Sequence, residues 1–288
     1  MKLGKVVLLA LGIALLALGV KRLMDIPGQQ AMLNDAVYLD EAVILPENEG
    51  KLVIIHGKPE MTVPAYDEEL GLTLNTIKAY RYDEEYKLKS SEKLLYQYGW
   101  MSKSSKGIVG KASLGEFALD EKTLNGFAAD SEYEDFDMAE ISAKGYAVAR
   151  GKTAEDALTD RWYVIVGGTY YYDAFEYSGD LSIPHVTREM DKAIADEREG
   201  AKAYAYKVYT GANYDEVTVA GIQHSGSLVT HEKLGSLVKE GVLTKEQVIS
   251  SYARSTALGR VLVHAVPGVL LIFFGLCKPK ARTKTKEA

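Results

Sequence analysis

The pattern of hydrophobic and polar residues gives the chain two apolar ends and a mixed middle. Near the C-terminus, Val261 to Cys277 contains no formally charged residue. As an α-helix this segment would rise about 25 Å, slightly less than the roughly 30 Å hydrocarbon core of a bilayer. Extending it back to Ala257 lengthens it by about one turn and leaves Arg260 near enough to the end to reach the headgroups. Because the segment has no polar face, it predicts a membrane span and not a soluble core helix.

The N-terminal segment Val6 to Val20 is also apolar and follows two lysines. Its length also fits the hydrophobic region of a signal peptide, so cleavage is the alternative. Lys21 and Arg22 follow the run directly, and no Ala-X-Ala motif stands where a signal peptidase would cut. These flanks favour an uncleaved anchor.

Small residues recur on both apolar segments. Gly12 and Gly19 are seven residues apart on the first, as are Gly268 and Gly275 on the second, and Ala10 and Ala14 add to the first. This spacing either lets another helix approach closely or reflects the ordinary composition of membrane helices, in which glycine is common.

Charge follows the same division. The formal net charge is −6; residues 1–24 contribute +4 and residues 257–288 contribute +5, so residues 25–256 carry −15. An acidic body repels phosphate, which argues against nucleic acid as a partner. All 19 tyrosines lie in that body, so it is amphipathic enough to fold and is not a disordered linker.

The basic residues also predict an orientation. Five follow Cys277 and place the C-terminus in the cytoplasm, and two spans return the N-terminus to the same side. Residues 25–256 then lie outside the cytoplasm. The single cysteine excludes a disulfide within the body, and the absence of an N-glycosylation sequon suits a bacterial inner-membrane protein. The predicted divisions are an anchor (1–24), an extracytoplasmic domain (25–243), an amphipathic helix leading into the C-terminal span (244–277) and a basic cytoplasmic tail (278–288).

Several segments of the body have strand patterns. Lys51 to Gly57 is a β-branched and leucine run bounded by glycines, which predicts a buried strand. Thr73 to Tyr86 and Leu94 to Met101 are predicted strands joined by a charged solvated loop at Asp83 to Glu92. Trp162 to Val166 and Thr169 to Tyr172 are predicted to form a hairpin around Gly167-Gly168. Ala203 to Thr210 and Glu216 to Gln223 are predicted strands with a turn at Gly211 to Asp215 between them.

Helix and loop signals complete the body. Val37 to Leu45 fits either a strand or a helical turn. Capping boxes at Thr153 to Asp156 and at Thr244 to Gln247 each predict the start of a helix. The helix that the second box opens has Val248, Ile249, Tyr252 and Ala253 on one face. A further helix is predicted over Thr187 to Glu199. Asn125-Gly126 is a predicted turn, and the acidic run Asp130 to Asp137 is a predicted solvated loop. The fold class is therefore α+β with mostly antiparallel sheet.

The histidines do not form a recognisable metal site. They are His56, His185, His224, His231 and His264, with no HExxH pair and no cysteine partner for zinc. His224 and His231 flank Ser225-Gly226 and could face each other across a hairpin; the alternative is two surface histidines. His264 lies inside the predicted span with no charged partner, so we expect a neutral imidazole hydrogen-bonded to a neighbouring helix.

Nucleophile and phosphate motifs are equally lacking. Ser113 in Lys111 to Gly115 has no glycine two positions before it, so it is not a nucleophile elbow. The sequence has no phosphate-binding loop. Carboxylate groups such as Glu47 with Glu49 and Asp83 to Glu85 are expected on the surface of an acidic body, and calcium bridging, the alternative, has no EF-hand spacing to support it. We predict no catalytic, cofactor-binding or metal-ligating residue.

Several segments, in order, resemble the LUMA (transmembrane protein 43) family. They are Pro46-Glu47-Asn48-Glu49-Gly50 with the following strand to Gly57, Tyr96 to Trp100, Gly179 to Leu181, Val217 to Val219, Gly241 to Val248, Arg254-Ser255 and Gly259-Arg260. Members of this family have an N-terminal span, a large non-cytosolic domain and C-terminal membrane helices. Animal members have several C-terminal spans where this chain has one predicted span, and the acidic segment Thr187 to Glu199 is an insert relative to the family.

The resemblance implies an integral membrane scaffold and offers no catalytic residues to carry over. Animal members reside in the inner nuclear membrane and organise lamins, partners that do not transfer to a bacterial type of chain. We therefore expect a non-enzymatic protein that organises or senses envelope components, with membrane lipids, further copies of itself and other envelope proteins as partners. The alternatives are a membrane-anchored enzyme acting on lipid or cell-wall material and an envelope domain that binds a small ligand or ion.

Overall fold

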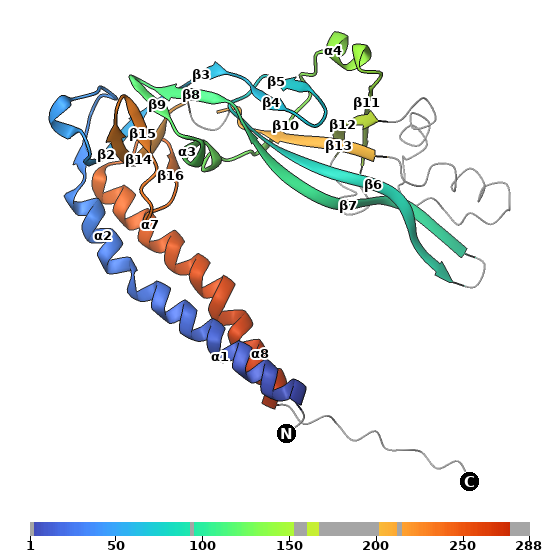
Figure 1. The fold of residues 1–288 in the computed structure, drawn as a ribbon, viewed down its shortest axis with the longest axis horizontal. Helices are drawn as coiled ribbons and strands as arrows, with labels where there is room; N and C mark the ends of the chain where they lie inside the picture. Colours follow the sequence, from blue (N-terminus) through green and yellow to red (C-terminus); the bar gives the residue numbers. More distant parts are fainter. Residues whose placement is uncertain (1–2, 93–94, 153–159, 167–201, 212–214, 277–288) are drawn as a thin grey trace. The chain divides into compact units, whose positions relative to one another are not determined.

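The computed structural model describes residues 3–92, 95–152, 160–166, 202–211 and 215–276 (Figure 1). Over these residues, helices from both ends of the chain accompany antiparallel β-sheets from its middle, so the predicted α+β class is confirmed. The chain divides into two compact units. Residues up to Tyr38 and from Leu243 onward form the helical unit, and Leu39–Val242 form the β unit.

The N-terminal part of the helical unit is one long apolar stretch of helix. α1 (Leu3–Met24) contains the predicted boundaries Val6 and Val20, and α2 (Ile26–Asp35) follows almost without interruption. The stretch Gly4–Asp35 is long and apolar enough to cross a membrane. The predicted N-terminal membrane helix therefore has the length and composition that it requires.

The C-terminal part agrees less completely with the prediction. α7 (Lys245–Arg260) runs through a π-helical turn, η2 (Val261–Ala265), into α8 (Val266–Leu276), as the pattern of an amphipathic helix entering an apolar one predicted. Its apolar helix, Val263–Phe274, rises only about 18 Å, less than a bilayer core. Of the expected boundaries, Val261 opens the π-turn and Cys277 lies outside the described residues.

Pro267 gives a physical reason for the π-turn. It is the second residue of α8 and has no N–H to donate to the carbonyl of Val263, four residues earlier. A wider turn immediately before a proline is one of the recognised ways for a helix to absorb such a missing bond. The sequence-based interpretation of this segment as one regular helix was wrong at this position.

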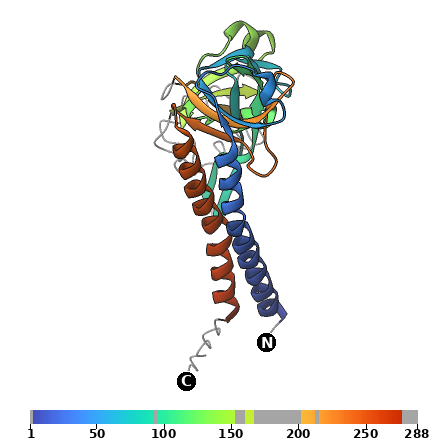
Figure 2. The same ribbon diagram turned by 90° about the vertical axis from the view of Figure 1, so that its left-hand side faces the viewer.

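The two helical runs lie side by side and antiparallel, with α1 against α8 and α2 against α7 (Figures 1 and 2). The Lys245 ammonium donates to the Ala36 carbonyl at 2.7 Å, and the Tyr38 hydroxyl, in the short strand β1 (Val37–Tyr38), donates to the Leu243 carbonyl at 3.1 Å. These two bonds connect the ends of the runs farthest from the chain termini.

The capping box that opens α7 is confirmed. The Thr244 N–H donates to Oε1 of Gln247 at 2.9 Å, and the Gln247 N–H donates to Oγ1 of Thr244 at 3.4 Å. Each bond satisfies a backbone donor that a helix start otherwise leaves unpaired. The predicted apolar face is buried or half-buried throughout: Val248, Ile249, Tyr252 and Ala253.

The first sheet of the β unit has the strand order β2-β14-β15-β9-β8-β3, with β16 also paired to β14. Its strands are β2 (Leu52–Gly57), β3 (Pro59–Val63), β8 (Lys111–Leu114), β9 (Phe117–Leu119), β14 (Val217–His224), β15 (Ser227–Val229) and β16 (Leu237–Glu240). Neighbours are antiparallel except β15 and β9. β2 confirms the predicted buried strand, because Val53, Ile54 and Ile55 are fully buried.

The second sheet is antiparallel throughout and has the order β11-β12-β13-β6-β7, with β10 on β13. Its strands are β6 (Lys78–Glu92), β7 (Leu95–Val109), β10 (Ser131–Glu132), β11 (Ala147–Lys152), β12 (Asp160–Val166) and β13 (Lys202–Val208). A small pair, β4 (Ala65–Asp67) and β5 (Leu72–Leu74), and the short helices η1 (Pro46–Asn48), α3 (Glu121–Asn125) and α4 (Met138–Ala143) complete the described unit. One core cluster unites β4, β5 and α4 with this sheet through Leu72, Ile141, Val164 and Tyr206.

Two predicted loops are wrong. Asp83 to Glu92 belongs to β6 and pairs with β7, because strand pairing uses backbone N–H and C=O groups, which charged residues also carry. The acidic run Asp130 to Asp137 contains β10 and the buried Tyr133, whose N–H donates to the Tyr206 carbonyl at 2.9 Å. In both segments the charge pattern predicted a loop, but the backbone of each segment pairs with another strand.

Other expectations meet mixed outcomes. The strands predicted at Ala203 to Thr210 and Glu216 to Gln223 are present as β13 and β14, but they belong to different sheets. Asn125-Gly126 ends α3, and only Val37–Tyr38 of the segment to Leu45 is strand. The capping box at Thr153, the second half of the Gly167-Gly168 hairpin, the helix at Thr187 to Glu199 and the tail lie outside the described residues.

Candidate functional site

The helices α1 and α8 approach each other closely at two glycines. A Cβ at Gly12 would lie 2.8 Å from the carbonyl oxygen of Gly268 and 2.7 Å from Cγ1 of Ile272. A Cβ at Gly268 would lie 3.0 Å from the carbonyl oxygen of Gly12. The distances from Gly12 are shorter than real Cβ contacts, and the distance from Gly268 is tighter than most, so the approach requires glycine at Gly12 and favours it at Gly268. Of the two interpretations of the small residues, the geometry favours close helix packing.

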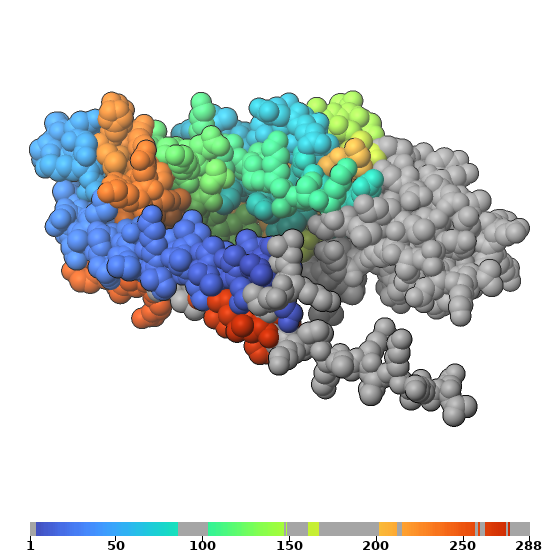
Figure 3. Space-filling model, turned by 60° about the horizontal axis from the view of Figure 1, so that its bottom comes forward, coloured from blue at the N-terminus to red at the C-terminus, as the bar shows by residue number. Residues whose placement is uncertain are grey.

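The outward side chains of the same two helices are large and apolar. Those more than two-fifths exposed include Val7, Leu11 and Ile13 on α1 and Val269, Phe273 and Phe274 on α8. Figure 3 shows α1 in blue with α8 in red beside it. Apolar area left in water costs roughly 25 cal/mol per Å², a cost that a hydrocarbon environment removes. The pair is therefore built for an apolar surrounding.

His264 lies at the contact between the π-turn and α1. The residue is 8% exposed, and its Cβ lies 3.1 Å from where a Cβ would stand on Gly19. Its Nδ1 is buried with no hydrogen-bond partner among the described residues. The expected hydrogen bond to a neighbouring helix is therefore not made through Nδ1.

The motif Pro46-Glu47-Asn48-Glu49-Gly50 has a structural role at the end of the first sheet. The Gly50 N–H donates to the Gln223 carbonyl at 2.8 Å, and Nε2 of Gln223 donates to the Leu45 carbonyl at 2.6 Å. Oε1 of Glu49 accepts from the Ser225 N–H at 3.0 Å. The motif therefore fastens the loop before β2 to the turn between β14 and β15, in which Ser225 and the next residue, Gly226, have φ of 48° and 79°.

The histidines at this turn do not converge. Nδ1 of His224 lies 3.0 Å from Oε1 of Glu49, whereas Nδ1 of His231 accepts from the Lys233 N–H at 3.2 Å. The β14–β15 register places His224 opposite Ser227. No group of three or more histidine, cysteine, aspartate and glutamate side chains in the described part of the chain could hold a metal ion.

A buried ion network around Arg81 was not anticipated. Arg81 on β6 is 2% exposed, and its Nη1 donates to both carboxylate oxygens of the fully buried Asp67 at 2.9 Å. Its other nitrogens bond Asp83 at 2.7 Å and Glu69, and the Tyr206 hydroxyl donates to Asp67 at 2.8 Å. Since every Arg81 side-chain nitrogen bonds a carboxylate, the network is a structural centre of the second sheet.

The pKa shifts in this network favour the charged form of Arg81 and the neutral form of Tyr206, the forms that donate its hydrogen bonds. Burial opposes the charge of Arg81, but hydrogen bonds to Asp83, Glu69 and Asp67 raise its pKa above the ordinary value. Burial, together with the charge of Asp67, raises the pKa of Tyr206. The sequence contained no signal for this arrangement, because Tyr206 is 139 residues from Asp67 and no local spacing links them.

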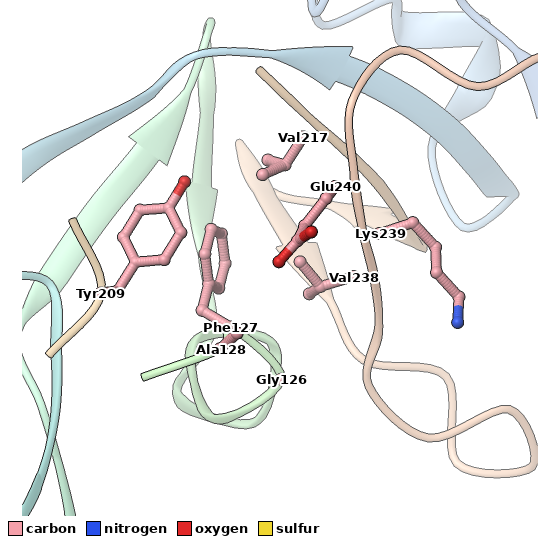
Figure 4. A pocket seen from close by; sticks show the side chains of 8 residues that line it. All are labelled: Gly126, Phe127, Ala128, Tyr209, Val217, Val238, Lys239 and Glu240. Carbon is pink, nitrogen blue, oxygen red and sulfur yellow. The ribbon is translucent and has the colours of Figure 1, made fainter. Parts of the chain in front are cut away.

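A second buried cation, Lys78, is hydrogen-bonded to Phe127, a residue that lines a small cavity. Nζ of Lys78 donates to the carbonyls of Asn125 and Phe127 at the end of α3, and burial lowers its pKa. The cavity of about 250 Å³ is lined by Gly126, Phe127, Ala128, Tyr209, Val217, Val238, Lys239 and Glu240. In Figure 4 the Phe127 ring and the Glu240 carboxylate border the cavity, and the Lys239 side chain extends away from it. Such a site could hold a small molecule, but it lacks a paired nucleophile and base.

The helix pair is thus the feature with the clearest physical specialisation, and the polar centres of the β unit are structural. Comparison of the chain with protein-family models, with curated proteins and with solved structures finds no match in any of the three. The function must therefore be inferred from these residues themselves.

Proposed function

We propose that the chain is a non-enzymatic membrane scaffold. In this proposal α1 and the run from α7 to α8 cross the bilayer as a hairpin, and the β unit stands outside the cytoplasm, where it organises or senses envelope components. The observation that carries the proposal is the contact at Gly12 and Gly268, surrounded by exposed apolar side chains. A helix pair that is tightly packed inside and apolar outside suits lipid and not water.

The short apolar helix Val263–Phe274 is compatible with a crossing if the flanking turns contribute. Residues 257–277 would reach the roughly 30 Å of the bilayer core with Arg260 directed to the headgroups. The basic residues next to α1 and in the tail then place both termini in the cytoplasm. The resemblance to the LUMA family, which rests on the order of several motifs, supports the same architecture and a scaffold role.

The absence of convergent chemistry within the described residues supports a non-enzymatic role. His224 and His231 have separate partners, and the Arg81 network leaves its carboxylates occupied. A catalytic site would need a nucleophile or base beside a concave surface. Small-ligand binding in the cavity beside Phe127 is the second candidate, but its volume of about 250 Å³ is below the roughly 300–1,000 Å³ of ordinary ligand sites.

Cysteine labelling in intact cells tests the topology. In a Cys277→Ser background, a membrane-impermeant maleimide should label Lys58→Cys, which replaces an exposed side chain of the β unit, without permeabilisation. In the unsubstituted chain, Cys277 should react only after permeabilisation. Labelling of Cys277 in intact cells, or protection of position 58, would contradict the proposed orientation.

Crosslinking in native membranes tests the scaffold role. The expected result is a reproducible set of crosslinked species larger than the monomer, identified by affinity purification from detergent extracts. The matched control is the Gly12→Leu variant, whose helix pair cannot close and whose crosslinked species should change. Recovery of monomer alone, with no co-purifying protein, would count against the proposal.

A further inference from the structure

The cavity beside Phe127 combines residues of both sheets of the β unit with the end of α3. Phe127 follows α3, Tyr209 directly follows β13 of the second sheet, and Glu240 ends β16 of the first. The volume of about 250 Å³ equals that of about eight water molecules at roughly 30 Å³ each. The cavity therefore suits a ligand with on the order of eight non-hydrogen atoms.

Strand alternation brings a carboxylate to this cavity and directs an ammonium away from it. In the antiparallel register of β14 and β16, Glu240 is opposite Val217 and Lys239 is opposite Thr218. Adjacent residues of a strand face opposite sides of the sheet. In Figure 4 the Glu240 carboxylate accordingly borders the cavity, whereas the Lys239 side chain extends away from it. Among the described residues, none forms a hydrogen bond or an ion pair with the Glu240 carboxylate.

The wall on the other side of the cavity is aromatic (Figure 4). The rings of Phe127 and Tyr209 pack edge to face, with their centroids 5.0 Å apart and an interplanar angle of 83°. Phe127 is buried and Tyr209 is half-buried, so the buried ring fixes the orientation of the accessible one. The face of an aromatic ring carries partial negative charge and attracts cations.

The charges around the Tyr209 hydroxyl are negative. Burial, together with the charges of Asp130, Glu240 and Asp215, raises the pKa of this hydroxyl. The phenol is therefore neutral at physiological pH, and its surroundings favour a positively charged ligand. Lys78 directs its ammonium to two backbone carbonyls at the end of α3 and not to the Glu240 carboxylate.

An organic cation matches this cavity better than a metal ion does. Calcium and magnesium require several oxygen ligands, whereas the side chains that line the cavity include one carboxylate. An alkylated ammonium uses both walls, because its charge faces the carboxylate and its methyl groups contact the aromatic ring. We propose that the cavity between Tyr209 and Glu240 binds a small organic cation. The inference goes beyond the proposed scaffold role and does not depend on it, since every residue of the cavity belongs to the β unit.

Choline and the neutral dimethylbutanol in which carbon replaces its nitrogen test the preference for charge. The two molecules have nearly the same shape, so their dissociation constants differ through the charge alone. Saturation-transfer NMR with the full chain in a non-ionic detergent measures both. The dissociation constant of choline should be lower by about tenfold. Equal constants, or no transfer of saturation to choline, would overturn the proposal.

Substitutions test the two walls separately. Glu240→Gln removes the charge and Tyr209→Leu removes the ring, and each should raise the dissociation constant of choline about threefold or more. Tyr209→Phe keeps the ring and should change the constant less than twofold. An unchanged midpoint of chemical denaturation without ligand shows that Glu240→Gln, at an exposed position, keeps the fold.

The matched control for the charge is Glu60→Gln. Glu60 is an exposed glutamate on β3, which three strands separate from β14 in the order of the first sheet. This variant should bind choline as the unsubstituted chain does. Equal weakening by Glu60→Gln and Glu240→Gln would indicate a general attraction of cations to the acidic body and would overturn the assignment of the site.

A free cation and a lipid headgroup both present this chemistry. A lower dissociation constant for glycerophosphocholine than for choline would identify a headgroup as the ligand, and a higher one would identify a free cation. Alkaline carbonate extraction separates this inference from the scaffold proposal. If carbonate releases the chain from membranes while choline still binds, the membrane role fails and the site stands. If the chain stays in the membrane but choline does not bind, the site alone fails.

Discussion

The substitution Gly12→Ala tests the packing on which the proposed membrane hairpin depends. The added methyl group would lie 2.7 Å from Cγ1 of Ile272, 2.8 Å from the Gly268 carbonyl oxygen and 3.0 Å from the Ile272 N–H. The Ile272 side chain can rotate away, but the carbonyl belongs to the backbone of α8. The two helices must therefore separate by about 0.5–1 Å, which forfeits roughly a quarter to a half of the dispersion energy across the contact.

The magnitude follows from comparison with Gly4→Ala, a matched change on the same helix. A Cβ at Gly4 has nothing within 4 Å, so Gly4→Ala removes a helical glycine without a clash. Overpacking of a closely packed contact costs about 1–3 kcal/mol. Because both substitutions gain similar helix propensity, we expect Gly12→Ala to destabilise the helix pair by about 1–3 kcal/mol relative to Gly4→Ala.

The separation of the helices can be measured by energy transfer in detergent micelles. In a Cys277→Ser background, dyes at Leu11→Cys and Phe273→Cys occupy exposed positions on α1 and α8 and leave the contact intact. Titration with sodium dodecyl sulfate gives the midpoint at which energy transfer is lost. The midpoint should fall for Gly12→Ala and not for Gly4→Ala. Equal midpoints for the two variants would refute the close packing at Gly12.

The remaining predictions concern stability and are measured by chemical denaturation in detergent. Asp67→Ala leaves Nη1 of the buried Arg81 without its carboxylate partner and should cost about 3–5 kcal/mol. Asp215→Ala, at an exposed ion pair, should cost about 0–1 kcal/mol, and similar losses for the two variants would contradict a buried network. Thr244→Ala removes one side of the capping box and should cost about 1 kcal/mol, with recovery in Thr244→Ser; no loss in the alanine variant would contradict the cap. Although burial raises the pKa of Asp120, its hydrogen bonds, including one from the Thr123 N–H at 2.7 Å, lower it overall. The stability that Asp120 contributes is therefore present above the unfolded pKa of about 3.9 and is lost as pH falls through the lower folded pKa. Asp120→Asn should flatten the acid side of a curve of unfolding free energy against pH. An unchanged acid side would contradict this reasoning.

Local patterns in the sequence predicted the elements that have a local sequence signal. The apolar run Val6 to Val20 formed α1, the Thr244 box formed as a reciprocal pair, and the β-branched run at residues 52–57 formed a buried strand. Each has its identifying residues within a short stretch, so spacing along the chain is enough to recognise it. The same reasoning was wrong at Asp83 to Glu92, where the charged residues predicted a loop but the segment forms a strand paired with β7.

Tertiary structure decided everything that joins distant residues. The strands β13 and β14 are nearly consecutive in sequence yet belong to different sheets, because strand partners are chosen by which faces can be buried together. Arg81 acquired Asp67 and Tyr206 as partners only through that arrangement. The glycines on the apolar helices show both levels: their spacing was visible in the sequence, but only the antiparallel packing of α1 against α8 selected Gly12 and Gly268 as the point of contact. The spacing of residues along the chain reflects what their own helix or strand requires. The distant residue that each one contacts depends on the free energy of the whole fold.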